Sequence, residues 1–309
     1  MNERQLRYFA KVVEIGNMTK AAALLNVAQP ALGLQIRQLE ETLQVPLLDR
    51  HSRGVDPTPA GRVLYDHAIA ILAHFERAES EVRNFGGQVE TITLGITHSM
   101  MRIVGQDLLV AARRDLPAVR FSYVEEPSIV LLREVEAGQL DLAFTYSSSD
   151  SQAIRQTPIQ REELLFVTRA DQAPEETVVG LEQLLAYELV LAGERDPIRQ
   201  MVDDAARQAN LKAEISFEVQ SLMTSRQMVL DGLAASILPY GVIADELEKG
   251  LVATRRITDA PFKRTLYLTR SNRRPHFQNE EQIMRLVRSA IKQLTLDLGE
   301  LAAPLGPDL

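Results

Sequence analysis

The 309-residue chain contains no cysteine, which excludes disulfide bonds, thiolate zinc sites and thiol-based redox sensing within it. It also lacks any run of about 18 or more apolar residues, so we expect no membrane-spanning helix and no membrane partner. The N-terminal stretch MNERQLRYFAKVV lacks the apolar core of a signal peptide, and we therefore expect a cytoplasmic protein. The five histidines show no spacing typical of a metal site, so we predict neither a metal nor a cofactor.

An excess of basic residues is also absent, because the formal net charge of the chain is −8. The charge is unevenly distributed: residues 1–60 carry a net charge of +1, and the remaining residues carry −9. We therefore expect that only the N-terminal part could meet a polyanion such as nucleic acid. The length exceeds what one ordinary hydrophobic core holds and suits two or three compact units.

Apolar spacing predicts three helices within the first 45 residues. The first ends near Gly16-Asn17, and a short second helix, KAAALLN, follows with Thr19 as a suitable N-cap. A third helix opens at Pro30, because the missing N–H of proline has no partner in the first helical turn. Its apolar stripe comprises Leu32, Ile36, Leu39 and Leu43. Two short helices joined tightly after a longer one are typical of a helix-turn-helix.

The third helix also presents a second face away from its apolar stripe. That face carries Gln29, Pro30, Gly33, Leu34 and Arg37. The following segment, residues 46–62, contains proline, glycine and basic residues and predicts a short hairpin or wing. A long helical pattern then runs from about Thr58 to Phe85, and Gly86-Gly87 predicts a hinge after it.

Short β-rich runs alternate with helical patterns from residue 91 onward. The first run is TITLGI, the last is LYLTR, and a helical pattern from about Phe277 to Leu298 follows. This alternation predicts parallel sheets with crossover helices. We predict a loose tail for the final residues, GELAAPLGPDL.

Six motifs in the first 65 residues together resemble LysR-type transcriptional regulators. They are Phe9 in the first helix, Thr19-x-Ala21-Ala22-x-x-Leu25, Gln29-Pro30-Ala31, Leu39-Glu40, Leu48-x-Arg50-x-x-Arg53-Gly54 and Thr58-Pro59-Ala60-Gly61. Each motif alone is unspecific, but all six occur in order at the spacing of the family. The rest of the chain agrees in length and in its alternation, including LDLAF and GLAASILP. The stretches RQLRYF, VAQPAL and RGVDPTPAG are similar to the nitrogen-assimilation-control branch.

The resemblance implies an all-α winged helix-turn-helix domain, a long linker helix, and an α/β effector domain with two lobes like a periplasmic binding protein. It places the DNA-binding domain at 1–58, the linker or dimerisation helix and hinge at 59–87, the effector domain at 91–298 and a flexible tail at 299–309. Within the effector domain it assigns 91–161 and 267–298 to lobe I and 162–266 to lobe II.

The resemblance also implies a bacterial, ligand-responsive transcriptional regulator that binds an interrupted inverted repeat near promoters. A small effector, an organic or inorganic anion, is expected to bind between the lobes and change transcription. The chain is expected to dimerise through the linker helix and to form a homotetramer. The further partners implied are double-stranded DNA and RNA polymerase.

Two other classes of protein compete with this interpretation. The first is an α/β enzyme with an N-terminal helical oligomerisation module. The chain contains no GxSxG, GxxxxGK[ST] or HExxH motif, so we predict that it is not an enzyme and has no catalytic residues. The second is a structural DNA-binding protein of the nucleoid, which the acidic body of the chain disfavours.

The third helix is expected to enter the major groove by its N-terminal end, where Gln29 could contact a base edge through its amide. Arg37 could meet phosphates, Arg53 could enter a narrow minor groove, and Arg50 could hold the wing or meet a phosphate. The alternative for each is an ordinary solvated side chain. The complete set of expected DNA contacts is Thr19, Gln29, Pro30, Gly33, Leu34, Arg37, Arg50 and Arg53.

Gly33 departs from the family, most members of which carry Ser or Thr at this position. A glycine here costs the helix up to about 1 kcal/mol relative to alanine. Two hypotheses follow: either Gly33 allows the backbone to approach DNA closely, or the regulator has given up one contact and depends more on other residues and on DNA shape.

The effector contacts are expected around THSM, residues 97–100, which follows the first β-rich run and begins a helix. Open α/β sheets bind ligands at such a position, and hydroxyls with free backbone N–H groups favour an anion. The alternative is that Thr97 and Ser99 only cap the helix. Arg195 could pair with an anionic effector or with a neighbouring acidic residue. The complete set of expected effector contacts is Thr97, His98, Ser99, Met100, Pro127, Ser128, Thr145, Tyr146, Arg195, Gln220 and Ser221.

Overall fold

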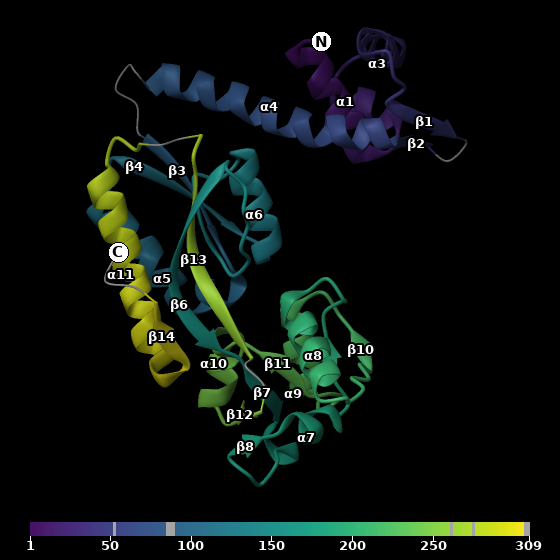
Figure 1. Ribbon diagram of the computed structural model, residues 1–309. Helices are drawn as coiled ribbons and strands as arrows, with labels where there is room; N and C mark the ends of the chain where they lie inside the picture. The colour runs from purple at the N-terminus through teal and green to yellow at the C-terminus, as the bar shows by residue number, and fades with distance from the viewer. Residues whose placement is uncertain (52–53, 85–89, 260–261, 274–275, 306–309) are drawn as a thin grey trace. The chain divides into compact units, whose positions relative to one another are not determined.

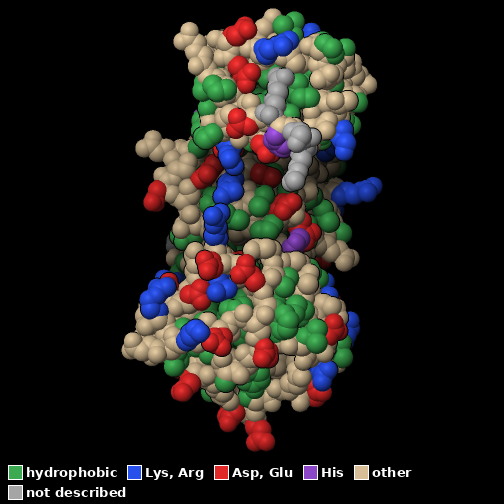
Figure 2. All heavy atoms as spheres, turned by 90° about the vertical axis from the view of Figure 1, so that its right-hand side faces the viewer, with side chains coloured by type: hydrophobic (Ala, Val, Ile, Leu, Met, Phe, Trp, Pro, Cys, Tyr) green, Lys and Arg blue, Asp and Glu red, His purple; other side chains and the backbone are tan. Residues whose placement is uncertain are grey.

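The computed structural model describes residues 1–51, 54–84, 90–259, 262–273 and 276–305. The chain forms two compact units (Figure 1). The first contains helices α1 to α4 and strands β1 and β2, and the second begins at Glu90. No helix within the described ranges has the length and the apolar character needed to cross a membrane. Figure 2 shows charged side chains of both signs interspersed with hydrophobic ones on the face drawn.

The first unit is a three-helix cluster followed by a hairpin and a long helix. Its elements are α1 (Glu3–Ile15), α2 (Met18–Leu24), α3 (Gln29–Leu43), β1 (Leu48–His51), β2 (Gly54–Pro57) and α4 (Pro59–Asn84). The predicted apolar stripes form its core, in which Phe9, Leu32 and Ile36 are fully buried. The small residues Ala21 and Ala22 are also buried in this core and let α2 approach its neighbours closely. The helix-turn-helix and the wing hairpin are therefore present as predicted.

Local hydrogen bonds set where these helices begin, and they correct one prediction. The side-chain oxygen of Asn17 accepts from the backbone N–H of Lys20, so Asn17 is the N-cap of α2 and Thr19 lies inside the helix. Asparagine is among the strongest N-caps, so it supersedes the threonine two residues later. The third helix begins at Gln29, one residue before Pro30, which still lies in the first turn.

The wing is anchored to helices on both sides. The Glu40 carboxylate of α3 accepts from the backbone N–H groups of Leu47 and Leu48, at 2.8 and 3.2 Å. Thr58 donates its hydroxyl proton to the Pro46 carbonyl and accepts from the Gly61 N–H. Gly61 has to be a glycine in this arrangement, because a Cβ there would lie 2.0 Å from the Leu47 carbonyl oxygen. The Thr58-to-Gly61 motif therefore fixes the start of α4 against the wing.

The second unit contains two main sheets and a small pair of strands. The six-stranded sheet has the order β14-β6-β13-β5-β3-β4, the four-stranded sheet has the order β11-β7-β12-β8, and β9 pairs with β10. The strands are β3 (Glu90–Ile96), β4 (Val119–Glu125), β5 (Leu142–Thr145), β6 (Ile154–Glu163), β7 (Leu165–Arg169), β8 (Val178–Val179), β9 (Val190–Leu191), β10 (Phe217–Glu218), β11 (Ser236–Leu238), β12 (Val252–Ile257), β13 (Lys263–Ser271) and β14 (Ala302–Pro304). The helices are α5 (His98–Asp115), α6 (Ser128–Ala137), α7 (Leu181–Leu185), α8 (Pro197–Gln208), α9 (Leu222–Leu230), α10 (Tyr240–Glu248) and α11 (Glu280–Leu298).

Helices cover both faces of the six-stranded sheet. Alternate residues of β5 point to opposite faces: Leu142 and Phe144 join the core beneath α5 and α11, whereas Ala143 joins the core beneath α6. The four-stranded sheet repeats this arrangement, with Phe166 and Leu165 of β7 in separate apolar clusters. The unit therefore has two α/β layers of its own, each with a hydrophobic core on both sides of a sheet.

The sheets are mixed rather than parallel, which corrects the prediction from the alternating pattern. β3 runs parallel to β4 and β5, but β13 is antiparallel to both β5 and β6. β6 and β13 pair along residues 154–163 and 263–271, and the predicted lobe boundaries at 161/162 and 266/267 fall inside these two strands. The positions predicted for the two crossings between the lobes therefore lie within continuous strands.

The end of the chain also differs from the predicted loose tail. Residues Gly299–Leu301 form a short 3-10 helix, and β14 then pairs with β6, Ala302 opposite Glu162. The side chain of Leu301 packs against the apolar clusters of both sheets. Of the predicted tail, 306–309 lies outside the described residues. The segment 299–304 is therefore part of the fold.

Candidate nucleic-acid interface and effector site

One face of α3 is exposed while the opposite face is buried. Leu32, Ile36 and Leu39 have no exposed surface, whereas Gln29 and Arg37 are exposed, as are the other predicted contacts Thr19, Pro30 and Leu34. The N-cap residue, Ala28, gives the helix no side-chain hydrogen bond. The first turn of α3 thus offers an amide side chain beside a helix N-terminus, which carries partial positive charge.

Gly33 does not lie on this exposed face. It is buried, and a Cβ built on it would lie 3.8 Å from the Cε atom of Met18, which is an ordinary van der Waals contact. The structure therefore contradicts Gly33 as a residue of the exposed face, because the helix turns this position toward α2. Space is available for a side chain, so close packing within the protein does not require glycine here.

The basic residues of the wing are only partly described. Arg50 lies in β1, opposite Val55 of β2, and Arg53 lies outside the described residues. His51 Nε2 and Asp56 Oδ2 lie 3.1 Å apart across the hairpin. The DNA contacts expected of Arg50 and Arg53 remain predictions.

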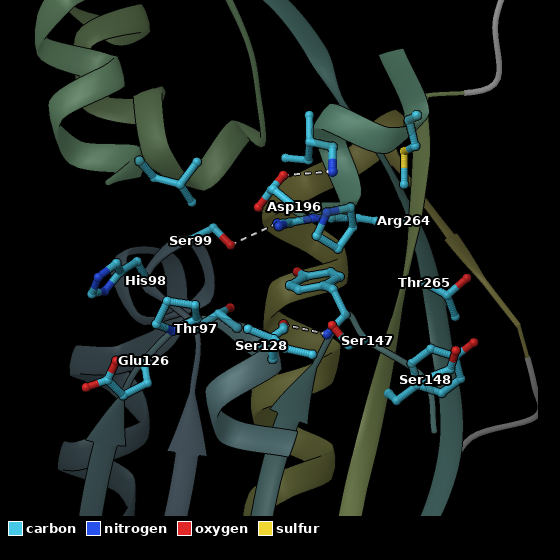
Figure 3. Close-up of a pocket in the computed structure, with 18 of the residues that line it drawn as sticks. Thr97, His98, Ser99, Glu126, Ser128, Ser147, Ser148, Asp196, Arg264 and Thr265 are labelled. Carbon is cyan, nitrogen blue, oxygen red and sulfur yellow. Dashed lines mark hydrogen bonds between the residues drawn. The ribbon is translucent and has the colours of Figure 1, made fainter. Parts of the chain in front are cut away.

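A cavity of about 560 Å³ lies in the second unit (Figure 3). Both sheets contribute to it, because its walls come from the loops after β3, β4 and β5, from the first turns of α8 and α9, and from the start of β13. The lining residues are Thr97, His98, Ser99, Glu126, Pro127, Ser128, Ile129, Tyr146, Ser147, Ser148, Asp196, Pro197, Ile198, Met201, Gln220, Ser221, Leu222, Lys263, Arg264, Thr265 and Tyr267. The predicted residues Thr97 to Ser99, Pro127, Ser128, Tyr146, Gln220 and Ser221 are thus brought together.

Four helices begin at the wall of this cavity: α5, α6, α8 and α9. Asp196 and Ser221 cap the first turns of α8 and α9 with their side-chain oxygens. Thr97 occupies the N-cap position of α5, but its side chain makes no capping hydrogen bond. The partial positive charges of several helix N-termini therefore face a shared space.

The hydroxyl of Thr97 is unusual, because it is buried and has no hydrogen-bond partner among the described residues. The Thr97 residue is 6% exposed. A buried hydroxyl without a partner costs about 1–3 kcal/mol relative to a satisfied one. Thr97 lines the cavity, so a ligand atom that reached this hydroxyl would supply its missing partner.

Arg264 forms the buried cationic group of the cavity. Its Nη2 donates to Ser99 Oγ over 2.8 Å, and its Nε and Nη2 bind the carboxylate of Glu162 over 2.8 to 3.0 Å. The guanidinium carbon lies 3.5 Å from the centroid of the Tyr146 ring, a cation–π geometry. The side chains of Arg264 and Glu162 are 10% and 1% exposed, so this ion pair is largely removed from water. Burial raises the pKa of the Tyr146 phenol, which therefore stays protonated at neutral pH.

Sequence reasoning missed Arg264 and Glu162. They lie directly opposite each other on β13 and β6, and 102 positions separate them along the chain. Lys263 and Arg264 stand at the start of β13, and this dipeptide alone does not indicate a binding site. Only the antiparallel pairing of these strands identifies them as partners.

Three predicted effector residues do not line the cavity. Met100 is fully buried in the core beneath α5, because the third residue of this helix points toward the sheet. Thr145 is fully buried, and its hydroxyl lies 2.8 Å from that of Thr269 in the neighbouring strand. Arg195 is exposed, and Asp196 next to it lines the cavity instead. His98 does line the cavity, and its ring binds Glu125.

Models of known protein families match the sequences of both units. The family model described as "Bacterial regulatory helix-turn-helix protein, lysR family" matches residues 3–62. The model described as "LysR substrate binding domain" matches residues 85–292. These two matches cover most of the chain.

Relatives and solved structures match between about three quarters and nearly all of the chain. The nitrogen assimilation regulatory protein nac of Klebsiella aerogenes is 31% identical over 303 residues, which are 97% of this chain and 99% of that protein. The protein of the same name from Escherichia coli K12 is 34% identical over 241 residues, 77% of this chain and 78% of that protein. CbnR, titled a LysR family transcriptional regulator, shares the fold with a TM-score of 0.68 at 24% identity, over 95% of this chain and 99% of its own. Full-length CbnR in its complex with target DNA aligns with a TM-score of 0.66 at 24% identity, over 95% of this chain and 100% of its own.

Proposed function

Because the chain belongs to the LysR family of transcriptional regulators, we propose that α3 reads an operator and that a small organic anion in the cavity controls the response. Family membership establishes that the protein is a DNA-binding transcriptional regulator with an effector-binding domain, and not an enzyme.

For DNA binding, the first turn of α3 enters the major groove. Gln29 contacts a base edge with its amide, and Arg37 contacts phosphates further along the exposed face. Two copies related by a two-fold axis would recognise an inverted repeat, since operator symmetry mirrors the symmetry of the protein. Arg50 and Arg53 of the wing would add contacts beside the groove.

For assembly, α4 is the dimerisation helix. Its first half packs on α1 through Ala68 and Leu72, but Phe75 and Val82 further along are 45% and 72% exposed. Apolar side chains on a long helix beyond its own domain core favour a helix of a second copy as their partner. We further propose a tetramer and an interaction with RNA polymerase, through which a promoter-bound regulator would change transcription.

For the effector, the chemistry of the cavity favours an organic anion over an inorganic one. Helix N-termini, Arg264 and the unpartnered Thr97 hydroxyl supply hydrogen-bond donors. The same cavity is lined by apolar surface from Pro127, Tyr146 and Met201, which a sulfate or phosphate ion would leave uncovered. Its volume lies within the range of about 300–1,000 Å³ typical of small-molecule sites. The buried, unpartnered Thr97 hydroxyl is the single observation that carries this proposal.

The test combines ligand binding with DNA binding on the full-length protein. We expect small organic carboxylates to raise the melting temperature, with about 2.7 kcal/mol of added stability at a concentration of 100 Kd. The same compounds should change the affinity for promoter DNA in a gel-shift assay, whereas sulfate and phosphate should change neither. A screen in which every organic anion leaves both measurements unchanged would contradict the proposed effector.

A further inference from the structure

We propose that the effector is a zwitterion, an α-amino acid or a close analogue with both an ammonium and a carboxylate group. This inference rests on the proposed function, because it concerns the same cavity.

The carboxylate belongs to Asp196. Its Oδ1 accepts the backbone N–H groups of Ile198 and Arg199, at 2.8 and 3.3 Å, and so caps α8. Its Oδ2 accepts from no group among the described residues. Asp196 lines the cavity, and in Figure 3 its side chain lies on the same side as Arg264 and Ser99. This carboxylate oxygen of Asp196 is therefore free to accept a hydrogen bond from a ligand.

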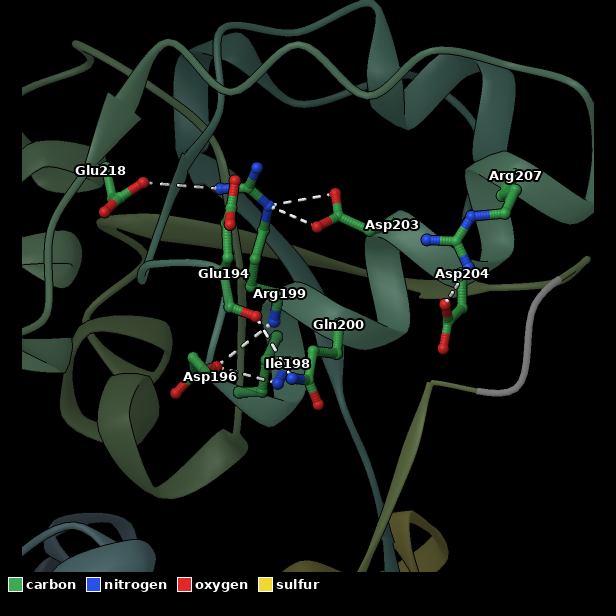
Figure 4. A network of polar contacts seen from close by, with 9 residues as sticks. All are labelled: Glu194, Asp196, Ile198, Arg199, Gln200, Asp203, Asp204, Arg207 and Glu218. Carbon is green, nitrogen blue, oxygen red and sulfur yellow. Dashed lines mark hydrogen bonds and ion pairs between the residues drawn. The ribbon is translucent and has the colours of Figure 1, made fainter.

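The nearest cation on the same helix does not neutralise Asp196. The guanidinium of Arg199 binds the Asp203 carboxylate, with Nε–O distances of 2.9 and 3.0 Å, and Glu218 lies 3.9 Å from its Nη1 (Figure 4). Arg199 contributes only its backbone N–H to Asp196. Within the described residues, the hydrogen bonds of the Asp196 carboxylate are the two that cap α8.

Among the organic carboxylates of the proposed function, the charges around the cavity favour one that also carries an ammonium group. Lys263 and Arg264 supply two positive charges to the lining. Glu126 and Asp196 supply two negative charges, and Glu162, bonded to Arg264, supplies a third. His98, which also lines the cavity, is bonded to the Glu125 carboxylate, so this pair adds no net positive charge. These groups carry one more negative than positive charge. A ligand with only negative charge would be repelled by this excess of negative charge, whereas a zwitterion adds no net charge and can pair its ammonium group with a carboxylate.

Thr97 and Arg264 in the lining can supply donors for the ligand carboxylate. The Thr97 hydroxyl is buried without a partner, at the N-terminus of the 18-residue helix α5. Arg264 uses Nε and Nη2 for Ser99 and Glu162, and its Nη1 has no partner within the described part of the chain. The two ends of an amino acid therefore find opposite chemistry: donors for its carboxylate at Thr97 and Arg264, and an acceptor for its ammonium at Asp196.

The experiment compares matched ligands on the full-length protein by calorimetry and thermal shift. The standard L-amino acids are screened first. For each binder, the 2-hydroxy acid with the same side chain removes the ammonium, and the decarboxylated amine removes the carboxylate. Phenylalanine, 3-phenyllactate and phenethylamine form one such set. We expect an amino acid to bind at least about tenfold more tightly than either partner, which is the usual effect of losing one charged hydrogen bond.

The matched variant is Asp196→Asn, which removes the charge but keeps an efficient N-cap, so α8 should remain intact. In this variant the amino acid should lose its tenfold advantage, while the hydroxy acid binds as well as to the wild type or better. An unchanged preference for the amino acid in Asp196→Asn would overturn the role of Asp196. Should the variant fold poorly, the wild-type comparison of amino acid and hydroxy acid still decides the ligand class.

The outcomes also separate this inference from the proposed function. Hydroxy acids that bind as tightly as the amino acids would overturn the zwitterion and leave the organic-anion effector standing. The same holds if other organic anions bind and every amino acid fails. If no organic anion of any kind binds, both proposals fail together with the cavity as a sensor.

Discussion

Two glycines in the first unit show how much one position depends on its surroundings. Gly61 lies where a Cβ would lie 2.0 Å from the Leu47 carbonyl oxygen, so no other residue fits without moving the backbone. Gly33 lies in the interior of α3, and a Cβ there would touch only Met18 at an ordinary distance. Glycine is thus required at one position and costs helix stability at the other.

Replacing Gly33 by alanine should stabilise the protein by about 1 kcal/mol, because alanine has the higher helix propensity and its methyl group fits beside Met18. Denaturant unfolding of the two proteins measures the difference. Gly61→Ala is the matched control and should be strongly destabilising. A loss of stability in Gly33→Ala would show that α2 and α3 pack more closely than the structure indicates.

Replacing Thr97 by valine tests the unpartnered hydroxyl. Valine has nearly the same shape, and no hydrogen bond within the described structure is lost. We therefore expect the unfolding free energy to stay equal or to rise by about 1 kcal/mol, while effector binding weakens by about 5- to 10-fold. Calorimetry with the ligand found in the screen measures the second effect. Equal ligand affinity in both proteins would place the ligand away from Thr97.

At the scale of elements, α3 buries its core residues Leu32, Ile36 and Leu39 and exposes Gln29 and Arg37, two of the predicted DNA contacts. Gln29 is expected to read bases, whereas Arg37 is expected to meet phosphates. Gln29→Ala should therefore reduce specific binding by about 1–3 kcal/mol and leave nonspecific binding nearly unchanged. Arg37→Ala should weaken both and lower the salt dependence by about one counterion. Gel shifts on operator and random DNA at several salt concentrations measure both effects. Equal losses of affinity for Gln29→Ala on the two DNAs would argue against base readout.

The C-terminal segment is a second element with a defined role, because it joins the apolar clusters of both sheets. Leu301 packs against both clusters, whereas Leu296 on α11 is 65% exposed. Leu301→Ala should lower the unfolding free energy by about 1–2 kcal/mol, less than for a fully buried leucine. Leu296→Ala should change it by less than about 0.5 kcal/mol. Thermal unfolding compares the two variants, and equal effects would mean that the segment contributes little to the fold.

At the scale of the whole molecule, the uneven charge separates the two tasks of the chain. The first 60 residues carry a net charge of +1 and the rest carry −9, so DNA contacts depend on a few basic groups on one unit. DNA affinity should fall by at least about tenfold between 50 and 200 mM salt, because counterions are released from phosphates. Binding of a zwitterion in the cavity should change much less over the same range, since its contacts are short and partly buried. Parallel titrations by fluorescence anisotropy and calorimetry measure both slopes.

The sequence by itself determined the features that depend on neighbours along the chain. The helix-turn-helix, the wing and the helix start at Thr97 to Ser99 follow from short-range spacing, turn residues and capping residues, and the structure contains them. The alternation of strands and helices likewise identified an α/β second unit. These patterns are local because a helix or strand buries one face at a fixed period.

Only the tertiary structure decided which distant residues meet. It paired Arg264 with Glu162 across 102 positions and placed Asp196 rather than Arg195 at the cavity. It also turned Gly33 toward α2, and it paired the last strand with β6. Strand register and the rotation of a helix about its axis are set by packing against partners far away in the sequence. Local patterns in one sequence do not identify those partners.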